Sequence, residues 1–175
     1  LVAIGDRVYV TLGFNSPVSA LDAATGRTLQ TYDGTAFTDE FVCHNGVLYL
    51  SVNDRPQKPW PGSGMFPEPT ATNSVSRKQV CAIEAATGKV LWKAGPFLGN
   101  SAKSDRMGSM RHLSLTVSEE GVFFVDEKAV VCLEPATGRE RWRAARLLFP
   151  NPALADSSRA FFYHSLSEVN LHALI

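Results

Sequence analysis

The residues most able to do chemistry in this 175-residue chain are three cysteines and four histidines. Cys43, Cys81 and Cys132 are scattered, whereas a haem attachment or thiolate ligand set needs cysteines close in sequence. The histidines lack a coordinating acid or thiol at ligand spacing. Pro61-Gly62-Ser63-Gly64 departs from the Gly-x-Ser-x-Gly turn of serine hydrolases, although a Ser-His-Asp set follows no fixed order and stays open. We therefore predict no catalytic, cofactor-binding or metal-binding residue.

The cysteines are instead expected to be buried thiols. Cys43 and Cys81 fall on strands separated by a third, roughly 9–10 Å apart, which is too far for a disulfide. Cys81 and Cys132 are one position out of step in the repeat described next. Because side chains alternate along a strand, we expect these two thiols on opposite faces of their sheets.

A longer pattern recurs three times along the chain. It consists of an acid three residues before the threonine of a Thr-Gly pair, a basic residue directly after the glycine, and a large side chain four positions beyond the glycine. The copies are Asp22, Thr25, Gly26 and Gln30; Glu84, Thr87, Gly88 and Trp92; and Glu134, Thr137, Gly138 and Trp142. Three copies, 62 and then 50 residues apart, indicate an internal repeat.

Each copy is typical of a tight turn between two strands. The acid can accept hydrogen bonds from backbone N–H groups two or three residues on, and glycine supplies a positive φ. Apolar and polar residues alternate on both flanks, and a second hairpin precedes each copy. The sequence therefore predicts four-stranded antiparallel meanders of roughly 40 residues each, and an all-β protein.

We expect these units to occupy 1–34, 35–98, 99–146 and 147–175, all within one domain. The second unit contains an insertion at 53–78, a loop at 95–112 precedes the third, and the fourth is incomplete. The chain thus holds about three and three-quarter units. A four-stranded sheet with two apolar faces cannot bury both alone, so neighbouring units must stack. Trp92 and Trp142 are expected to pack between them.

These units resemble the blades of the eight-bladed β-propellers of the pyrroloquinoline quinone (PQQ) dehydrogenase superfamily. Their repeat ends in a tryptophan docking motif, Ala-x-Asp-x-x-Thr-Gly-x-x-x-Trp, and the resemblance covers nearly the whole chain. It implies a partial propeller, since closed propellers typically have four to eight blades. Gln30 departs from the motif, which leaves the docking contact of the first unit open.

The two insertions are expected on one face of the propeller. In an up-and-down sheet, the connection between the second and third strands and the connection from the fourth strand to the next unit lie at the same end. The candidate interaction residues there are Arg55, Lys58, Trp60, Arg106 and Arg111. Trp and Arg are favoured anchors at interfaces, so these residues could bind an anionic or extended partner. A solvated decoration with no partner is the alternative.

The charge of the insertions differs from that of the whole chain. Seventeen basic side chains balance seventeen acidic ones overall. Residues 53–78 carry four basic against two acidic side chains, and 95–112 carry three against one, so each has a net charge of +2. We therefore expect a local charge of +4 on the insertion face.

The family resemblance implies two functions, because it covers quinoprotein dehydrogenases and non-catalytic propellers, such as the lipoprotein of the outer-membrane β-barrel assembly machinery. We favour a non-catalytic binding scaffold of the periplasm or cell envelope. Its expected partners are a protein or extended ligand on the insertion face and the remaining blades of the parent propeller. The alternative is a fragment of a PQQ-dependent dehydrogenase, with its PQQ and calcium ligands outside this chain; a multidomain enzyme that uses the propeller to present substrate is a third.

Two further classes are disfavoured by composition. The balanced charge argues against a dedicated nucleic-acid binder. No uninterrupted apolar run reaches the ~18 residues that a membrane helix needs. We therefore predict neither a nucleic-acid partner nor a membrane span.

Overall fold

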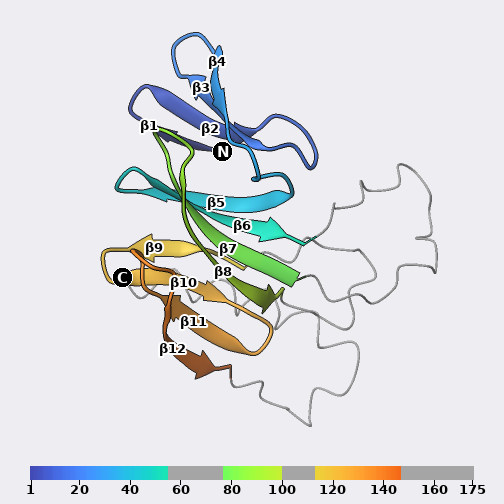
Figure 1. Ribbon diagram of the computed structural model, residues 1–175, viewed down its shortest axis with the longest axis vertical. Coiled ribbons are helices and arrows are strands. Elements are labelled where there is room, and N and C mark those ends of the chain that lie inside the picture. The colour runs from blue at the N-terminus through green and yellow to red at the C-terminus, as the bar shows by residue number, and fades with distance from the viewer. Residues whose placement is uncertain (55–76, 100–112, 147–175) are drawn as a thin grey trace, which may run out of the picture. The chain divides into compact units, whose positions relative to one another are not determined.

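The computed structural model describes residues 1–54, 77–99 and 113–146 (Figure 1). The regular elements of these residues are all strands. They are β1 (Val2–Ile4), β2 (Arg7–Thr11), β3 (Val18–Asp22), β4 (Thr28–Thr31), β5 (Thr38–His44), β6 (Val47–Asn53), β7 (Arg77–Glu84), β8 (Val90–Leu98), β9 (Thr116–Ser118), β10 (Gly121–Val125), β11 (Ala129–Leu133) and β12 (Glu140–Ala145). The chain divides into two units, Leu1–Ala145 and Arg146–Ile175. The predicted incomplete unit 147–175 lies outside the described residues.

The strands form three separate antiparallel sheets of four. Sheet 1 has the order β1-β2-β3-β4, sheet 2 the order β5-β6-β7-β8, and sheet 3 the order β9-β10-β11-β12. Consecutive strands are neighbours throughout, which is the up-and-down meander that the repeats predict. The all-β prediction and the four-stranded units are confirmed.

The pairing of the last two strands carries the same irregularity in every sheet. The register shifts between Ala20 and Leu21 in sheet 1, and between Ala82 and Ile83 in sheet 2. It shifts between Cys132 and Leu133 in sheet 3. Each shift lies directly before the acid of the repeat, where a bulge increases the local twist and redirects the chain into the turn.

Sheets 1 and 2 share one apolar core. Its buried members are Tyr9, Val18, Ala20 and Tyr32 from sheet 1 or the segment after it, and Leu48, Leu50, Cys81, Ile83 and Ala85 from sheet 2. Because neighbouring side chains on a strand point to opposite faces, the residues between these belong to the other face of sheet 2. Fully burying a side chain of this size contributes about 1.5–3 kcal/mol.

That other face packs against sheet 3. The second core contains Tyr49, Val80, Ala82, Trp92 and Phe97 of sheet 2, and Leu113, Leu115, Val122, Phe124, Ala129, Val131 and Leu133 of sheet 3 and the segment before it. The rings of Phe97 and Phe124 meet edge to face with centroids 4.6 Å apart. Sheet 2 is thus buried on both faces, as stacking of the repeats requires.

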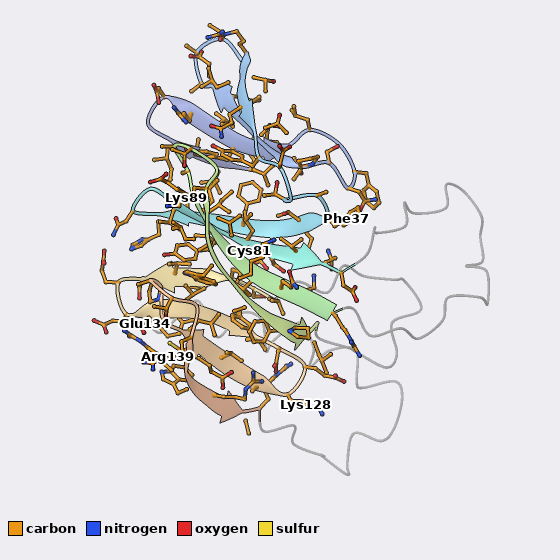
Figure 2. The ribbon with its side chains drawn as sticks, in the orientation of Figure 1. Phe37, Cys81, Lys89, Lys128, Glu134 and Arg139 are labelled. Carbon is orange, nitrogen blue, oxygen red and sulfur yellow. The ribbon has the colours of Figure 1, made fainter. Side chains whose placement is uncertain are left out.

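The cysteine predictions hold in part. All three thiols are free, and Cys81 and Cys132 are buried, whereas Cys43 is only half-buried. Figure 2 shows Cys81 within sheet 2. Cys81 belongs to the core shared with sheet 1. Cys132 alternates with Val131 and Leu133, which face sheet 2, so it points to the far side of sheet 3. The expected opposite placement of Cys81 and Cys132 is therefore confirmed.

The predicted boundaries of the two insertions are wrong at their edges. The insertion predicted at 53–78 is shorter, because Asn53 pairs with Lys78 and prolongs β6 and β7. The loop predicted at 95–112 starts later, because β8 continues to Leu98. Strand β9 begins only at Thr116, since Ser114 adopts a left-handed φ of 58° that an extended strand does not permit.

Candidate functional site

The Thr-Gly turns have the same backbone in all three sheets. The N–H of the glycine donates to the carbonyl of the acid at 2.8 Å in each. The N–H of the acid donates to the carbonyl of the residue after the glycine, at 2.8 to 2.9 Å. Gly26, Gly88 and Gly138 have φ values of 71°, 78° and 70°, a region that suits glycine. Figure 2 shows Glu134 and Arg139 at the turn of sheet 3.

The acid of the turn plays two roles that depend on its length. Asp22 Oδ1 accepts hydrogen bonds from Ala24 N at 3.2 Å, Thr25 N at 2.8 Å and Thr25 Oγ1 at 2.7 Å. The hydroxyl of Thr25 is the main reason that the pKa of Asp22 lies below its usual value, with the Thr25 N–H second. The predicted acceptance of backbone N–H groups is thus confirmed for Asp22.

The prediction is wrong for the two glutamates, which are one methylene longer. The hydroxyls of Thr87 and Thr137 donate to the carboxylates of Glu84 and Glu134. No backbone N–H donates to either carboxylate within the described part of the chain. The longer side chain carries the carboxylate past the amides of the turn and leaves it at the threonine hydroxyl.

Trp92 of sheet 2 rests on the turn of sheet 3. Its Nε1–H donates to the carbonyl of Pro135 at 2.7 Å, and its side chain is buried. A methyl group on Gly138 would overlap the indole ring, so glycine is needed there for close approach as well as for its φ. We call this arrangement, a ring of one sheet seated on the Thr-Gly turn of the next, a ring-to-turn contact.

Sheet 1 makes the same contact with a different residue. Tyr32, two positions after Gln30, donates its hydroxyl to the carbonyl of Ala85 at 2.5 Å. Ala85 directly follows Glu84, as Pro135 follows Glu134, so the acceptor position is equivalent. A methyl group on Gly88 would lie 2.7 Å from Tyr32 Cδ1, which shows the same close approach. Gln30 contributes a second hydrogen bond, from its Nε2 to the Thr87 carbonyl at 2.8 Å.

The departure at Gln30 therefore does not abolish the contact of the first unit. Tyr32 was missed by sequence reasoning because the repeat was aligned on one position. Its spacing could have revealed it, because a residue two positions beyond Gln30 lies on the same face of an extended strand. Tyrosine also combines a large ring with a hydrogen-bond donor.

Trp142 differs from Trp92 in its surroundings. Its side chain is 47% exposed, whereas Trp92 is 8% exposed. Its ring lies 5.9 Å from that of Phe123, much as Trp92 lies 6.0 Å from Tyr49. No acceptor for its Nε1–H is found in residues 1–54, 77–99 and 113–146. The expected packing of Trp142 against a neighbouring sheet is thus not made among the described residues.

The stems of the two insertions lie at one end of sheet 2. Asn53 at the end of β6 pairs with Lys78 near the start of β7, and Lys78 pairs with Phe97 near the end of β8. The Thr-Gly turn occupies the opposite end of the same strands. The shared end predicted for the insertions is confirmed for their stems. The candidate interaction residues Arg55, Lys58, Trp60, Arg106 and Arg111 all lie outside the described residues.

A buried ion pair closes the insertion end of sheet 2. The ammonium group of Lys78 contacts Asp39 Oδ2, and the two side chains are 1% and 2% exposed. Asp39 Oδ1 and Ser51 Oγ are also buried, and no described group forms a hydrogen bond with either. Lys78 was counted as a surface charge of the insertion, which is wrong: Asp39 neutralises it, so the charge expected on this face falls by one.

Glu40 connects the same end of sheet 2 to sheet 3. Its Oε2 accepts a hydrogen bond from Ser114 N at 3.0 Å, and its Oε1 accepts one from Leu115 N at 2.7 Å. Two backbone donors are thereby satisfied where the chain re-enters sheet 3. Glu40 thus acts as a connector between sheets.

Sheet 3 shows how this end closes without an insertion. Asp126 Oδ1 accepts hydrogen bonds from Lys128 N at 2.8 Å and Ala129 N at 2.7 Å. Its Oδ2 accepts one from Arg143 Nη1 at 2.6 Å. Hydrogen bonds from Arg143 to Glu140 and Asp126 raise the pKa of the guanidinium above its usual value. A three-residue turn therefore replaces the insertion at this end of sheet 3.

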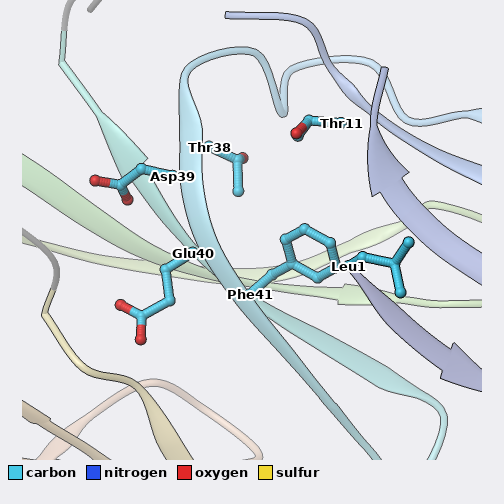
Figure 3. A pocket seen from close by; sticks show the side chains of 6 residues that line it. All are labelled: Leu1, Thr11, Thr38, Asp39, Glu40 and Phe41. Atoms are coloured by element: carbon cyan, nitrogen blue, oxygen red, sulfur yellow. The ribbon is translucent and has the colours of Figure 1, made fainter. Parts of the chain in front are cut away.

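A hollow of about 380 Å³ lies between the edges of sheets 1 and 2 at the insertion end. It is lined by Leu1, Thr11, Thr38, Asp39, Glu40 and Phe41. Figure 3 shows the carboxylates of Asp39 and Glu40 turned away from Leu1 and Thr11. Both carboxylates are bonded to the protein itself, to Lys78 and to the backbone before sheet 3. The hollow therefore presents hydroxyl groups and an aromatic ring, and no pair of free carboxylates for acid–base chemistry.

Neither a metal-ligand cluster nor a membrane-spanning helix is present among the described residues. No group of three or more His, Cys, Asp or Glu side chains is placed to hold a metal ion there. No helix long and apolar enough to cross a membrane occurs in that part of the chain. The side-chain contacts that the structure does show either join one sheet to the next, as Trp92, Tyr32 and Glu40 do, or close the end of a single sheet, as the Lys78–Asp39 pair does.

The comparisons with known proteins agree with this architecture. Residues 73–158 match a family model described as outer membrane protein assembly factor BamB. A solved quinohemoprotein alcohol dehydrogenase, ADHIIG from Pseudomonas putida HK5, resembles the chain in fold with a TM-score of 0.52 at 19% identity. No curated protein matches the chain in sequence.

The fold likeness covers most of this chain but only a small part of the dehydrogenase. The likeness to the dehydrogenase covers 82% of this chain and 20% of that chain, so the chain spans about a fifth of its length. At this identity it concerns the fold alone. Together, the family match and the fold support a PQQ-like β-propeller family for this chain, as its repeats predicted.

Proposed function

We propose that the chain is a non-catalytic PQQ-like β-propeller segment that acts as a binding scaffold in the periplasm or cell envelope. The observation that carries this proposal is that the acidic side chains at the insertion end bind groups of the chain itself. At the insertion end of sheet 2, Asp39 binds Lys78 and Glu40 binds the backbone before sheet 3. Asp39 thus closes the end of sheet 2 and Glu40 joins it to sheet 3, which leaves the insertions as the variable surface.

The family match supports the class of partner and the compartment. The matching model is described as an outer-membrane protein assembly factor. A protein partner on the insertion face, and a location in the cell envelope, follow from that description as proposals for this chain. Trp92 and Tyr32 then serve as docking residues that keep the sheets at a fixed spacing below that face.

A binding role for the insertion can be tested by replacing it with a short turn. Residues 55–76 are replaced by the Asp-Glu-Lys turn of sheet 3, which keeps Asn53 and the Lys78–Asp39 pair intact. The matched control replaces Glu119, at the opposite end, with glutamine. In photo-crosslinking of intact cells, we expect the unaltered protein to form an adduct with an envelope protein. The turn variant should lose this adduct and the control should keep it. Circular dichroism checks that both variants remain folded.

Loss of the adduct in both variants, or in neither, would count against a binding role for the insertion. A second arm tests the enzymatic alternative. The parent protein is titrated with PQQ and calcium while dye reduction by alcohols or sugars is followed. Saturable cofactor binding with substrate-dependent dye reduction would replace the scaffold by a quinoprotein dehydrogenase.

A further inference from the structure

The turn between β5 and β6 contains the pair Asn45-Gly46, at the end of sheet 2 opposite to the insertion stems. Both residues adopt a left-handed φ, 47° for Asn45 and 74° for Gly46, as the two central residues of a type I′ hairpin turn require. Both are exposed to solvent. The other six asparagines of the chain precede serine, aspartate, proline or leucine, so Asn45 alone is followed by a residue without a side chain.

An asparagine followed by glycine can lose its side-chain amide without an enzyme. The backbone nitrogen of Gly46 attacks Cγ of Asn45, since glycine places no side chain beside the attacking atom. A bond forms between Gly46 N and Asn45 Cγ, the Cγ–Nδ2 bond breaks, and the amide nitrogen leaves as ammonia with the proton of the Gly46 N–H. Water then opens the cyclic imide at one of its two carbonyls, which gives aspartate or isoaspartate. The net reaction consumes one water and releases one ammonia.

A residue of the neighbouring sheet holds the amide that must leave. Glu119 lies in the turn between β9 and β10 of sheet 3, and its Oε1 accepts a hydrogen bond from Asn45 Nδ2 at 2.7 Å. His44 Nε2 lies 3.2 Å from the same oxygen. Cyclisation moves the amide group of Asn45 onto Gly46 N, and this movement breaks the hydrogen bond to Glu119.

The backbone of the same turn is held within sheet 2. The carbonyl of Gly46 accepts a hydrogen bond from Ala85 N at 2.8 Å. The turn is thus restrained twice, at its backbone by sheet 2 and at its side-chain amide by sheet 3. Only the second restraint depends on contact between two sheets.

We propose that Asn45 is a site of spontaneous deamidation, and that its hydrogen bond to Glu119 of the next sheet slows the reaction. The product exchanges a hydrogen-bond donor for a carboxylate that faces Glu119, and two like charges repel. Each deamidated chain therefore loses one of the contacts that join sheets 2 and 3. The modification loosens this interface as the protein ages.

Timed incubation of the full chain tests the site, with the product followed by peptide mapping and mass spectrometry. Glu119→Ala removes the restraint, and Glu119→Asp withdraws the carboxylate by one methylene while keeping its charge. Glu119→Gln is a control that keeps an acceptor oxygen at the same length. Glu120→Ala is a second control, because it removes a neighbouring acid whose side chain has no described hydrogen bond. Every chain is incubated both folded and unfolded in guanidinium chloride.

In guanidinium chloride, all five chains should lose the amide of Asn45 at one rate, and faster than that of any other asparagine, because sequence alone then decides. The folded wild type should react more slowly than this. Glu119→Ala and Glu119→Asp should speed the folded reaction about 3–10-fold, the range expected for loss of one exposed hydrogen bond. Glu119→Gln and Glu120→Ala should keep the rate of the wild type.

Three results would overturn the proposal. Folded chains, variants included, could form no product at Asn45, which would mean that the turn itself excludes the reaction. Glu119→Ala and Glu119→Asp could both leave the rate unchanged, or Glu120→Ala could speed it as much as they do. Circular dichroism verifies the fold of each variant. If Glu119→Ala unfolds, Glu119→Asp decides, because it keeps the charge at a side chain that is 78% exposed.

Discussion

At the scale of single residues, two different aromatic side chains make the same ring-to-turn contact. Trp92 and Tyr32 differ in size and in position along the repeat, yet both rings lie on a glycine and both donate to the carbonyl after the acid. The common requirement is a flat ring with one donor at its edge. The repeat is therefore defined by a contact that more than one residue type can make.

Removing the donor of Trp92 should be costly. In Trp92→Phe the half-buried carbonyl of Pro135 loses its partner, and the free energy of unfolding should fall by about 1–3 kcal/mol. Trp142→Phe is the control: its ring is exposed and has no described acceptor, so it should change stability by less than about 0.5 kcal/mol. Urea denaturation of dilute protein measures both, and equal effects would contradict the role of the hydrogen bond.

Asp22 gives a prediction on pH. Its pKa lies below the usual value because the Thr25 hydroxyl and N–H groups bond to the ionised carboxylate. The stabilisation it provides is present above the pKa of the unfolded chain and is lost as pH falls through the lower pKa of the folded chain. Thr25→Val should raise the pKa of Asp22 in an NMR titration. Thr28→Val, on the same hairpin, should leave that pKa unchanged.

At the scale of elements, each sheet has one end with a nearly constant turn and one end that carries variation. The Thr-Gly end is short and nearly identical in all three sheets. The other end has a three-residue turn in sheet 3 and a long insertion in sheet 2. Polar groups such as Asp39, Glu40 and Asp126 hold this second end together.

The close approach of ring and glycine can be measured against backbone strain alone. Gly138→Ala should destabilise the chain well beyond Gly46→Ala, although both positions have a left-handed φ, of 70° and 74°. The strain is common to both, while only the methyl group at 138 meets an indole ring. The difference should be about 1–3 kcal/mol in urea denaturation, as is typical for overpacking. Equal losses would show that φ alone requires glycine.

The Lys78–Asp39 pair should show strong coupling. Lys78→Met leaves a buried carboxylate without its partner and should cost about 3–5 kcal/mol of unfolding free energy. Asp39→Leu should cost a similar amount for the same reason. The double variant should recover most of the loss, because neither charge then remains buried. Additive losses in this double-mutant cycle would mean that the two groups do not depend on each other.

Sequence reasoning predicted what repeats and missed what occurs once. The strands, their meander and the turns follow from a pattern present in three copies, and sequence alone provides that signal. Tyr32 and the Lys78–Asp39 pair each occur once, so no second copy reveals them. Lys78 is separated from Asp39 by 39 residues, and only the register of β5, β6 and β7 brings them together. A lysine beside a proline-rich insertion is expected at the surface on sequence grounds. The burial of Lys78 results from tertiary packing.

At the scale of the whole molecule, the stack of three sheets behaves as a one-dimensional array in which each sheet contacts only its neighbours. Sheets 1 and 2 share one core and sheets 2 and 3 share another, with the two cores on opposite faces of sheet 2. Disturbance of one interface should therefore leave the other largely intact.

Cys81 reports on one of these interfaces alone. It is buried between sheets 1 and 2, and this burial raises the pKa of its thiol. Tyr32→Phe should weaken that interface by about 1–2 kcal/mol and speed alkylation of Cys81 by about 5–30-fold. Trp92→Phe, which acts on the other interface, should change the rate far less. Mass spectrometry of iodoacetamide-treated protein follows the modification, and equal acceleration would show that the stack opens as one body.

The position of the buried ion pair has a consequence for how such a protein can change over evolution. Ring-to-turn contacts lie at one end of the strands, while the predicted insertion joins the other end, where Asn53 pairs with Lys78. Lengthening a loop costs little conformational entropy, about 0.6 kcal/mol per doubling. With its stem closed by Lys78 and Asp39, this site can accept new sequence without loss of the contacts that join the sheets. It is a natural graft point, where a new binding specificity can be introduced into an unchanged frame.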